Sequence, residues 1–98
     1  MFVVSITYRT DLSQVELLLA EHLRFLDANY QAGHFLASGP KVPRTGGIIL
    51  ANIPSREALH TLLENDPFYR DGIAVYEITE FSVTKAAANL SELVVQSS

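Results

Sequence analysis

The chain has 98 residues, the length of one domain, and its 48% hydrophobic and 18% charged residues are typical of a globular protein. Seven Lys and Arg side chains stand against 11 Asp and Glu, so the net charge is −4 and the basic surface of a nucleic-acid-binding protein is missing. Cysteine is absent, which excludes disulfides, a thiol nucleophile and cysteine-ligated metals.

The N-terminal segment MFVVSITYRT lacks the basic start and long apolar run of a signal peptide. No apolar run elsewhere approaches the ~18–20 residues of a membrane span. We therefore expect a cytoplasmic protein that binds neither membrane nor nucleic acid.

The first third of the chain predicts a strand followed by a long helix. Residues 2–8 (FVVSITY) are rich in β-branched and aromatic residues, which favour a strand. From an N-cap at Asp11 or Ser13 to about Gly33, apolar residues recur at spacings of three and four, which predicts an amphipathic helix. The heavier side chains of the strand alternate toward one face, which we expect to be the core face: Phe2, Val4, Ile6 and Tyr8.

The remaining sequence predicts two strands, a second helix and a final strand. Residues 34–38 and 47–53 are apolar segments separated by a loop rich in proline and glycine. Ser55 is the expected N-cap of the second helix, which ends at Asn65-Asp66-Pro67 because the residue before a proline disfavours helical backbone. Residues 73–83 are the expected last strand.

The order strand-helix-strand, strand-helix-strand predicts an α+β, ferredoxin-like βαββαβ fold. It places two helices on one face of a four-stranded antiparallel sheet. We expect a single domain over residues 1–98, with its core at about 1–83 and a short C-terminal helix in the tail, 84–98.

The last two strands carry apolar residues on both of their faces. Ile48 and Leu50 alternate with Ile49 and Ala51, for example, whereas a solvated face should be polar. A second sheet packed against this face would cover it, so we predict a sheet-mediated homodimer or a larger homo-oligomer.

His22 and Asp66 are the candidates for acid–base chemistry. His22 falls in the direction of Leu19 and Leu26 on the apolar side of the first helix, and Asp66 leans toward the core at the end of the second. Neighbouring helices could bring the two side chains together. An aspartate at a helix C-terminus faces the negative end of the helix dipole and benefits from a cation, and the carboxylate would make the imidazole a better base.

A structural explanation of the same residues stays open. An inward histidine is more often a core residue, and Asp-Pro after a helix is often only a stop signal. Of the other histidines, His60 falls on the outer face of its helix, and His34 opens a strand where a capping or surface role is expected.

Ser38-Gly39-Pro40 is the next candidate for ligand contact. Glycine lets the backbone approach a ligand closely, and Ser38 offers a hydroxyl or an amide. A strand that ends in a turn explains the same residues without a ligand. No nucleophile elbow, phosphate-binding glycine loop or zinc spacing is present, so we expect no cofactor and no metal.

Short segments along the chain also form a recognisable pattern. They are Glu21-His22-Leu23 with Phe25-Leu26, Gly33 and Phe35 before Ser38-Gly39-Pro40, Gly46-Gly47 before a strand, Asp66-Pro67-Phe68, and Tyr76-Glu77-Ile78 with Glu80-Phe81. In this order and spacing they resemble the YCII-related family, from the first strand to about Phe81.

The resemblance implies a ferredoxin-like domain of the dimeric α/β-barrel group that dimerises through its sheet. It implies an active site around a histidine–aspartate pair, which falls on His22 and Asp66, with Ser38 near the same pocket. The neighbouring motif residues are the further expected substrate contacts: Gly39, Pro40 and Phe68.

One position departs from the family. Many members carry an arginine about one turn before the histidine, where this chain has Leu18, Leu19 and Ala20. If that arginine binds an anionic substrate, this protein needs another cation or another substrate. The loop residues that could replace it are Arg9, Lys41 and Arg44.

These observations predict a small cofactor-independent enzyme acting on a cyclic or aromatic-derived metabolite by elimination, isomerisation or lactone-type chemistry. His22 would be the general acid/base, Asp66 would orient it, and Ser38 or the adjacent backbone would bind a substrate oxygen. Two alternatives remain: a non-catalytic binding or regulatory dimer whose pocket holds a metabolite, and a structural dimer in which the pair joins two helices.

Overall fold

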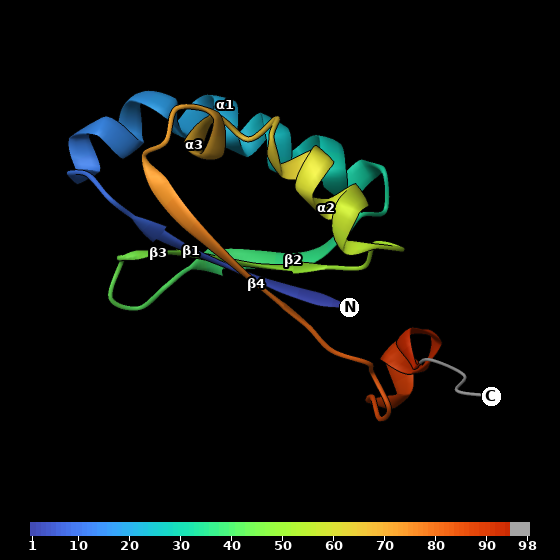
Figure 1. Cartoon of the computed structure of the whole chain (residues 1–98). Coiled ribbons are helices and arrows are strands. Elements are labelled where there is room, and N and C mark those ends of the chain that lie inside the picture. Colours follow the sequence, from blue (N-terminus) through green and yellow to red (C-terminus); the bar gives the residue numbers. More distant parts are fainter. Residues whose placement is uncertain (95–98) are drawn as a thin grey trace.

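A four-stranded sheet carries the α-helices on one of its faces (Figure 1). The computed structural model describes residues 1–94. Its elements are β1 (Phe2–Tyr8), α1 (Leu12–Gln31), β2 (Phe35–Pro40), β3 (Gly46–Ala51), α2 (Arg56–Leu63), α3 (Pro67–Arg70), β4 (Ala74–Glu80) and the 3-10 helix η1 (Ala88–Leu93). Among these residues, no helix is both long and apolar enough to cross a membrane.

The strands follow the order β2-β3-β1-β4, and every neighbouring pair is antiparallel. Phe2 of the central strand β1 lies opposite Ala51 of β3 and Glu80 of β4. This is the ferredoxin-like α+β arrangement, so the predicted fold is confirmed.

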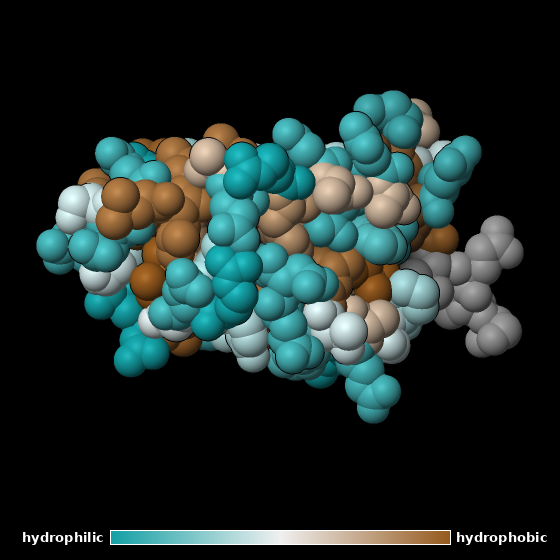
Figure 2. Space-filling model, turned by 90° about the horizontal axis from the view of Figure 1, so that it is seen from above, coloured by the Kyte–Doolittle hydropathy of each residue, from teal (hydrophilic) through white to brown (hydrophobic). Residues whose placement is uncertain are grey.

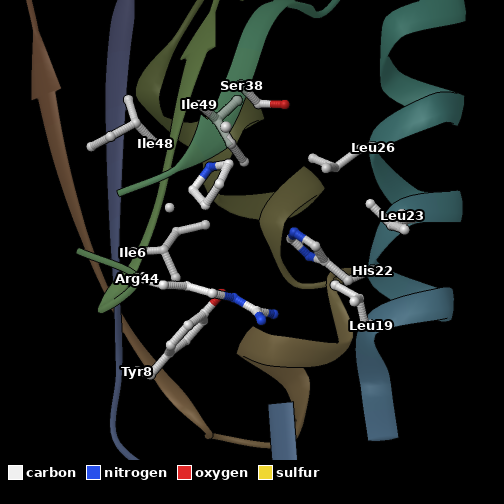
Figure 3. A pocket seen from close by; sticks show the side chains of 14 residues that line it. Ile6, Tyr8, Leu19, His22, Leu23, Leu26, Ser38, Arg44, Ile48 and Ile49 are labelled. Carbon is white, nitrogen blue, oxygen red and sulfur yellow. The ribbon is translucent and has the colours of Figure 1, made fainter. Parts of the chain in front are cut away.

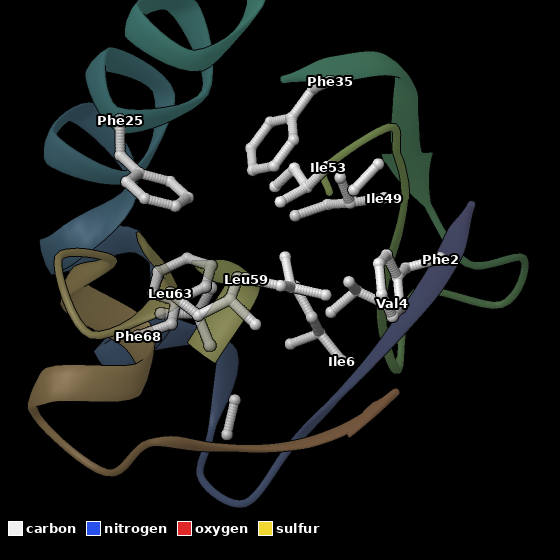
Figure 4. Packing of buried hydrophobic residues seen from close by; sticks show 13 residues of the cluster. Phe2, Val4, Ile6, Phe25, Phe35, Ile49, Ile53, Leu59, Leu63 and Phe68 are labelled. Atoms are coloured by element: carbon white, nitrogen blue, oxygen red, sulfur yellow. The ribbon is translucent and has the colours of Figure 1, made fainter. Parts of the chain in front are cut away.

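The core lies between the sheet and the helical layer (Figure 4). On β1, Phe2, Val4 and Ile6 are at most 2% exposed, as the alternation of this strand predicts. α2 contributes Leu59 and Leu63, which are fully buried. The outward surface of the helical layer mixes hydrophilic side chains with hydrophobic patches (Figure 2).

Two predicted helix ends are confirmed by their geometry. The Ser55 hydroxyl accepts a hydrogen bond from the Ala58 backbone N–H (3.1 Å), which caps α2. Gly33 follows α1 with a φ of +81°, a left-handed conformation that glycine adopts without a Cβ clash. In contrast, β2 continues past Ser38, and Gly39 and Pro40 are its last two residues, because an edge strand tolerates the missing proline N–H.

Asp66 begins a new helix instead of ending the second one. α2 stops at Leu63, and Asp66 is the N-cap of the four-residue helix α3, with Pro67 in its first turn. Proline suits that position because its missing N–H would have no partner inside the helix. The expectation that Asp66 faces the negative end of a helix dipole is therefore wrong.

The sheet face opposite the helices is partly apolar. Ile48 and Val75 are 37% and 47% exposed there, and half-buried Val3 pairs with Leu50. After β4 the chain runs away from the sheet and reaches η1, which lies below the sheet in the view of Figure 1. η1 has no buried residue. The predicted tail helix thus exists as a 3-10 helix, and the end of the predicted tail, residues 95–98, lies outside the described part of the chain.

Candidate functional site

A cavity of about 600 Å³ opens between α1 and the strands β1, β2 and β3 (Figure 3). Its volume is in the range of small-molecule sites. Aliphatic side chains make most of its walls, and a few polar groups interrupt them. The lining residues are Ile6, Tyr8, Leu19, His22, Leu23, Leu26, Ser38, Gly39, Pro40, Arg44, Gly46, Gly47, Ile48 and Ile49.

Helix α1 presents His22 to this cavity, one helical turn from both Leu19 and Leu26. The His22 side chain is 11% exposed, and its Nδ1 lies 2.8 Å from Asp66 Oδ1. That oxygen also accepts the Phe68 backbone N–H (3.1 Å), so it is an acceptor and His22 Nδ1 donates to it. In the neutral ring the proton therefore sits on Nδ1, which leaves Nε2 with its lone pair.

Asp66 receives a third donor on its other oxygen. The Tyr76 hydroxyl of β4 donates to Oδ2, while the Asp66 side chain is fully buried. A buried carboxylate is costly unless it is hydrogen-bonded, and three donors offset that cost here. Burial raises the pKa of Tyr76, and the charge of Asp66 raises it further, so the phenol keeps the proton that it donates.

Phe68 lies behind the imidazole and outside the lining of the cavity. Phe68 is 2% exposed, and its ring stacks on the His22 ring with the centroids 4.0 Å apart and an interplanar angle of 10°. The short helix α3 thus supplies both the Asp66 contact and the stacking surface. Arg70 at the end of α3 donates to Glu21, the neighbour of His22, at 2.7 and 3.2 Å, which gives α1 and α3 a second link.

Ser38, Gly39 and Pro40 line the cavity from the edge strand β2. The Ser38 hydroxyl shares a hydrogen bond of 2.5 Å with the Tyr30 hydroxyl of α1. The structure therefore brings His22 and the Ser-Gly-Pro segment to one cavity, with Asp66 and Phe68 directly behind the histidine ring.

The loop cations are distributed unequally around the site. Arg44 lines the cavity, whereas Lys41 donates from Nζ to the Thr7 hydroxyl (3.0 Å) and is not part of the lining. Arg9 does not line the cavity either. Of the three candidate replacements for the family's arginine, only Arg44 reaches the cavity within the described residues.

The two remaining histidines lie away from the site. His34 Nδ1 is 2.9 Å from the side-chain oxygen of Asn29, and His60 is exposed on α2. Within residues 1–94, no group of three or more His, Asp and Glu side chains is placed to hold a metal ion.

Tyr76 is a site residue for which the sequence predicts no role. Its position on the same face of β4 as Ile78 indicates a core-facing side chain, but that pattern does not indicate a polar partner. The partner is Asp66, ten residues earlier and in a different element. Tyr8, which lines the cavity from the end of β1, was expected only as a core residue.

The fold and the site together define a class of protein. Its members are ferredoxin-like domains with a histidine–carboxylate pair beside a cavity of small-molecule size. The family model of the YCII-related domain matches residues 1–82, and the chain belongs to this family. No curated protein matches the chain.

Among solved structures, the chain is similar to 5-chloro-2-hydroxyhydroquinone dehydrochlorinase from Burkholderia phenoliruptrix AC1100 in complex with 2,5-dihydroxybenzoquinone. The TM-score is 0.70 and the sequence identity 22%, over 84% of this chain and 93% of that one. At this identity the likeness concerns the fold.

Proposed function

We propose that the protein is a small-molecule enzyme in which His22 transfers a proton to or from a cyclic or aromatic-derived substrate. The reaction classes that suit this step are elimination, isomerisation and lactone-type chemistry. The observation that carries the proposal is the 2.8 Å contact of His22 Nδ1 with Asp66, because it leaves Nε2 as the proton-accepting atom of a ring that lines the cavity.

Asp66 has two effects on this proton transfer. It fixes the imidazole in the tautomer with the proton on Nδ1, and its charge stabilises the imidazolium that forms when Nε2 takes a proton. Phe68 supports the ring from behind. General acid–base assistance of this kind accelerates a reaction by about 10²–10⁴-fold, which suits a substrate that is already activated.

The cavity walls favour a ring with polar substituents. Leucine and isoleucine side chains would pack on the ring faces, and Ser38 would donate to or accept from a ring oxygen. The structurally similar dehydrochlorinase acts on a chlorinated hydroxyhydroquinone. In such an elimination, a base removes one proton, chloride departs with the electron pair of the carbon–chlorine bond, and a double bond forms.

We also propose that two copies pair through the outer face of the sheet. The exposed side chains of Ile48 and Val75 support this homodimer, because a solvated sheet face is normally polar. Pairing would cover that face, where the Ile48 side chain points away from α1 (Figure 3), and would leave the space between the sheet and α1 to the substrate.

The test compares rate and stability in the same variants. We expect the wild type to release chloride from 5-chloro-2-hydroxyhydroquinone under anaerobic conditions, and Asp66→Asn and His22→Gln to lose most of that rate. Asparagine is as good an N-cap as aspartate and has nearly the same shape, so Asp66→Asn should still fold. His60→Gln, at an exposed position on α2, is the matched control.

Three results would contradict the proposal. If the Asp66→Asn protein loses stability while its folded fraction keeps the wild-type rate, the pair is structural. If 2,5-dihydroxybenzoquinone binds and neither the wild type nor any variant releases chloride, the non-catalytic binding alternative is favoured. If His22→Gln keeps the rate, His22 is not the base.

A further inference from the structure

We infer that the substrate carries an anionic oxygen group, such as a phenolate or a carboxylate, and that Arg44 binds this group. The inference rests on the proposed function, because it names the substrate class of the same cavity. Arg44 is then the residue that makes the cavity select substrates by their charge.

Among the described residues that line the cavity, Arg44 is the only Lys or Arg. It belongs to the loop between β2 and β3, and in Figure 3 it extends from the strands toward α1, with its guanidinium directed to the side that holds Leu19 and His22. The whole protein has a net charge of −4, so a generally basic surface does not explain a guanidinium at the cavity.

The guanidinium is weakly held by the protein itself. Within residues 1–94 its nearest carboxylate is Glu16, with Nη1 3.7 Å from Oε1, and the two side chains are 39% and 63% exposed. That distance exceeds a hydrogen bond, and exposed ion pairs contribute little. Arg70 differs, because both of its terminal nitrogens donate to Glu21 at 2.7 and 3.2 Å.

A ligand carboxylate would bind the Arg44 guanidinium more strongly than Glu16 does. The planar guanidinium fork matches a carboxylate with two parallel hydrogen bonds, and such charge-assisted pairs are about twice as strong as neutral hydrogen bonds. Because no residue among 1–94 pairs with Arg44 in this geometry, an anionic substrate would gain the contact without breaking a strong one within that part of the chain.

The loop that carries Arg44 is anchored to the sheet on both sides. The Lys41 backbone N–H donates to the Gly46 carbonyl, and the Tyr8 N–H donates to the Thr45 carbonyl, each at 2.9 Å. These bonds hold both ends of the loop, so we expect the main ordering cost of binding to fall on the Arg44 side chain. A substrate held there by its anion would present its ring between the aliphatic walls, on the side of His22.

The test uses two probes that share a ring and differ in charge, 2,5-dihydroxybenzoate and 2,5-dihydroxybenzamide, titrated by calorimetry and by NMR. We expect the wild type to bind the benzoate about tenfold more tightly than the benzamide, as a charge-assisted pair at a half-exposed site suggests. Arg44→Gln should abolish this preference and leave the benzamide affinity unchanged. Glu16→Gln should strengthen benzoate binding, because it removes the competing carboxylate.

Lys41→Gln is the matched control, since Lys41 belongs to the same loop and does not line the cavity. Equal affinity of the wild type for both probes, binding of neither probe, or a preference that survives in Arg44→Gln would each overturn the inference. Unfolding curves of the variants verify that each protein titrated is folded.

The proposed function fails in a different experiment. If His22→Gln keeps its rate of chloride release while Arg44→Gln loses the preference for benzoate, His22 is not the base and Arg44 still selects anions. If the chloride release depends on His22 while both probes bind equally, the enzyme proposal stands and the charge selectivity does not.

Discussion

The Tyr76 hydroxyl donates its hydrogen bond to Asp66 Oδ2, the carboxylate oxygen that His22 leaves free. This arrangement connects β4, the start of α3 and α1 through one buried carboxylate. The carboxylate is held on both oxygens, so it cannot rotate away from the imidazole without losing a donor. Tyr76 is therefore a positioning residue for His22, although it does not line the cavity.

Tyr76→Phe should lower the free energy of unfolding at pH 7 by about 1.5–3 kcal/mol, because it removes a hydrogen bond to a buried charged group. Urea denaturation measures this change. Tyr69→Phe is the matched control, since Tyr69 is 41% exposed and contacts the same Tyr76 ring edge-on. A loss no larger than that of the control would mean that the Tyr76–Asp66 bond does not stabilise the fold.

The same tyrosine should make stability depend on pH in the alkaline range. An unfolded tyrosine ionises at about pH 10, whereas burial and the Asp66 charge raise the pKa of Tyr76 in the folded protein. The contribution of Tyr76 is complete below pH 10. Above pH 10 the unfolded state binds fewer protons than the folded state. The free energy of unfolding therefore falls by up to about 1.4 kcal/mol per pH unit.

Urea denaturation between pH 8 and pH 11 checks this sign. The stability difference between the wild type and Tyr76→Phe should narrow above about pH 10, while Tyr69→Phe gives the background for an exposed tyrosine. A difference that stays constant or widens over this range would contradict the prediction.

The parts of the fold that follow from local patterns could be predicted from the sequence. The alternation of β1 identified its buried face, and Ser55 and Gly33 identified helix ends, because these signals depend only on neighbouring residues. α3 was missed, since four residues are too short for a helical periodicity and Asp-Pro resembles a stop signal.

The site was predictable only where its residues lie on regular elements. His22 could be placed toward the core from the helical spacing of α1. Arg44 could not be placed, because its position depends on the conformation of the loop between β2 and β3, and no periodic pattern encodes that conformation. The partner of Tyr76 depends in the same way on a tertiary contact.

Gly46→Ala should destabilise the protein strongly. A Cβ at Gly46 would lie 1.7 Å from the Ile6 carbonyl oxygen of the neighbouring strand, and this backbone atom cannot move without breaking the pairing of β1 with β3. We expect a loss of about 1–3 kcal/mol or more, as for an overpacked core. Gly39→Ala is the control, because nothing lies within 4 Å of its Cβ position. Thermal denaturation should show a much lower midpoint for Gly46→Ala than for the wild type or Gly39→Ala. Equal midpoints for the two variants would contradict the predicted clash.

The proposed sheet-mediated dimer predicts a charge-sensitive association. Val75 is 47% exposed on the outer face of β4, so Val75→Lys should leave the fold intact and place a charge in the apolar contact between two sheets. Sedimentation velocity should then find a dimer for the wild type and a monomer for the variant. Leu17→Lys is the control, because Leu17 is 76% exposed on α1, in the helical layer on the opposite side of the sheet.

Dissociation by Leu17→Lys but not by Val75→Lys would place the contact between copies on the helical layer. In that arrangement a neighbouring copy would lie close to the cavity, and the apolar outer face of the sheet would need another explanation. A monomeric wild type would contradict the dimer and leave the acid–base proposal intact, because the contact of His22 with Asp66 and the hydrogen bonds of Phe68 and Tyr76 to Asp66 need no second copy.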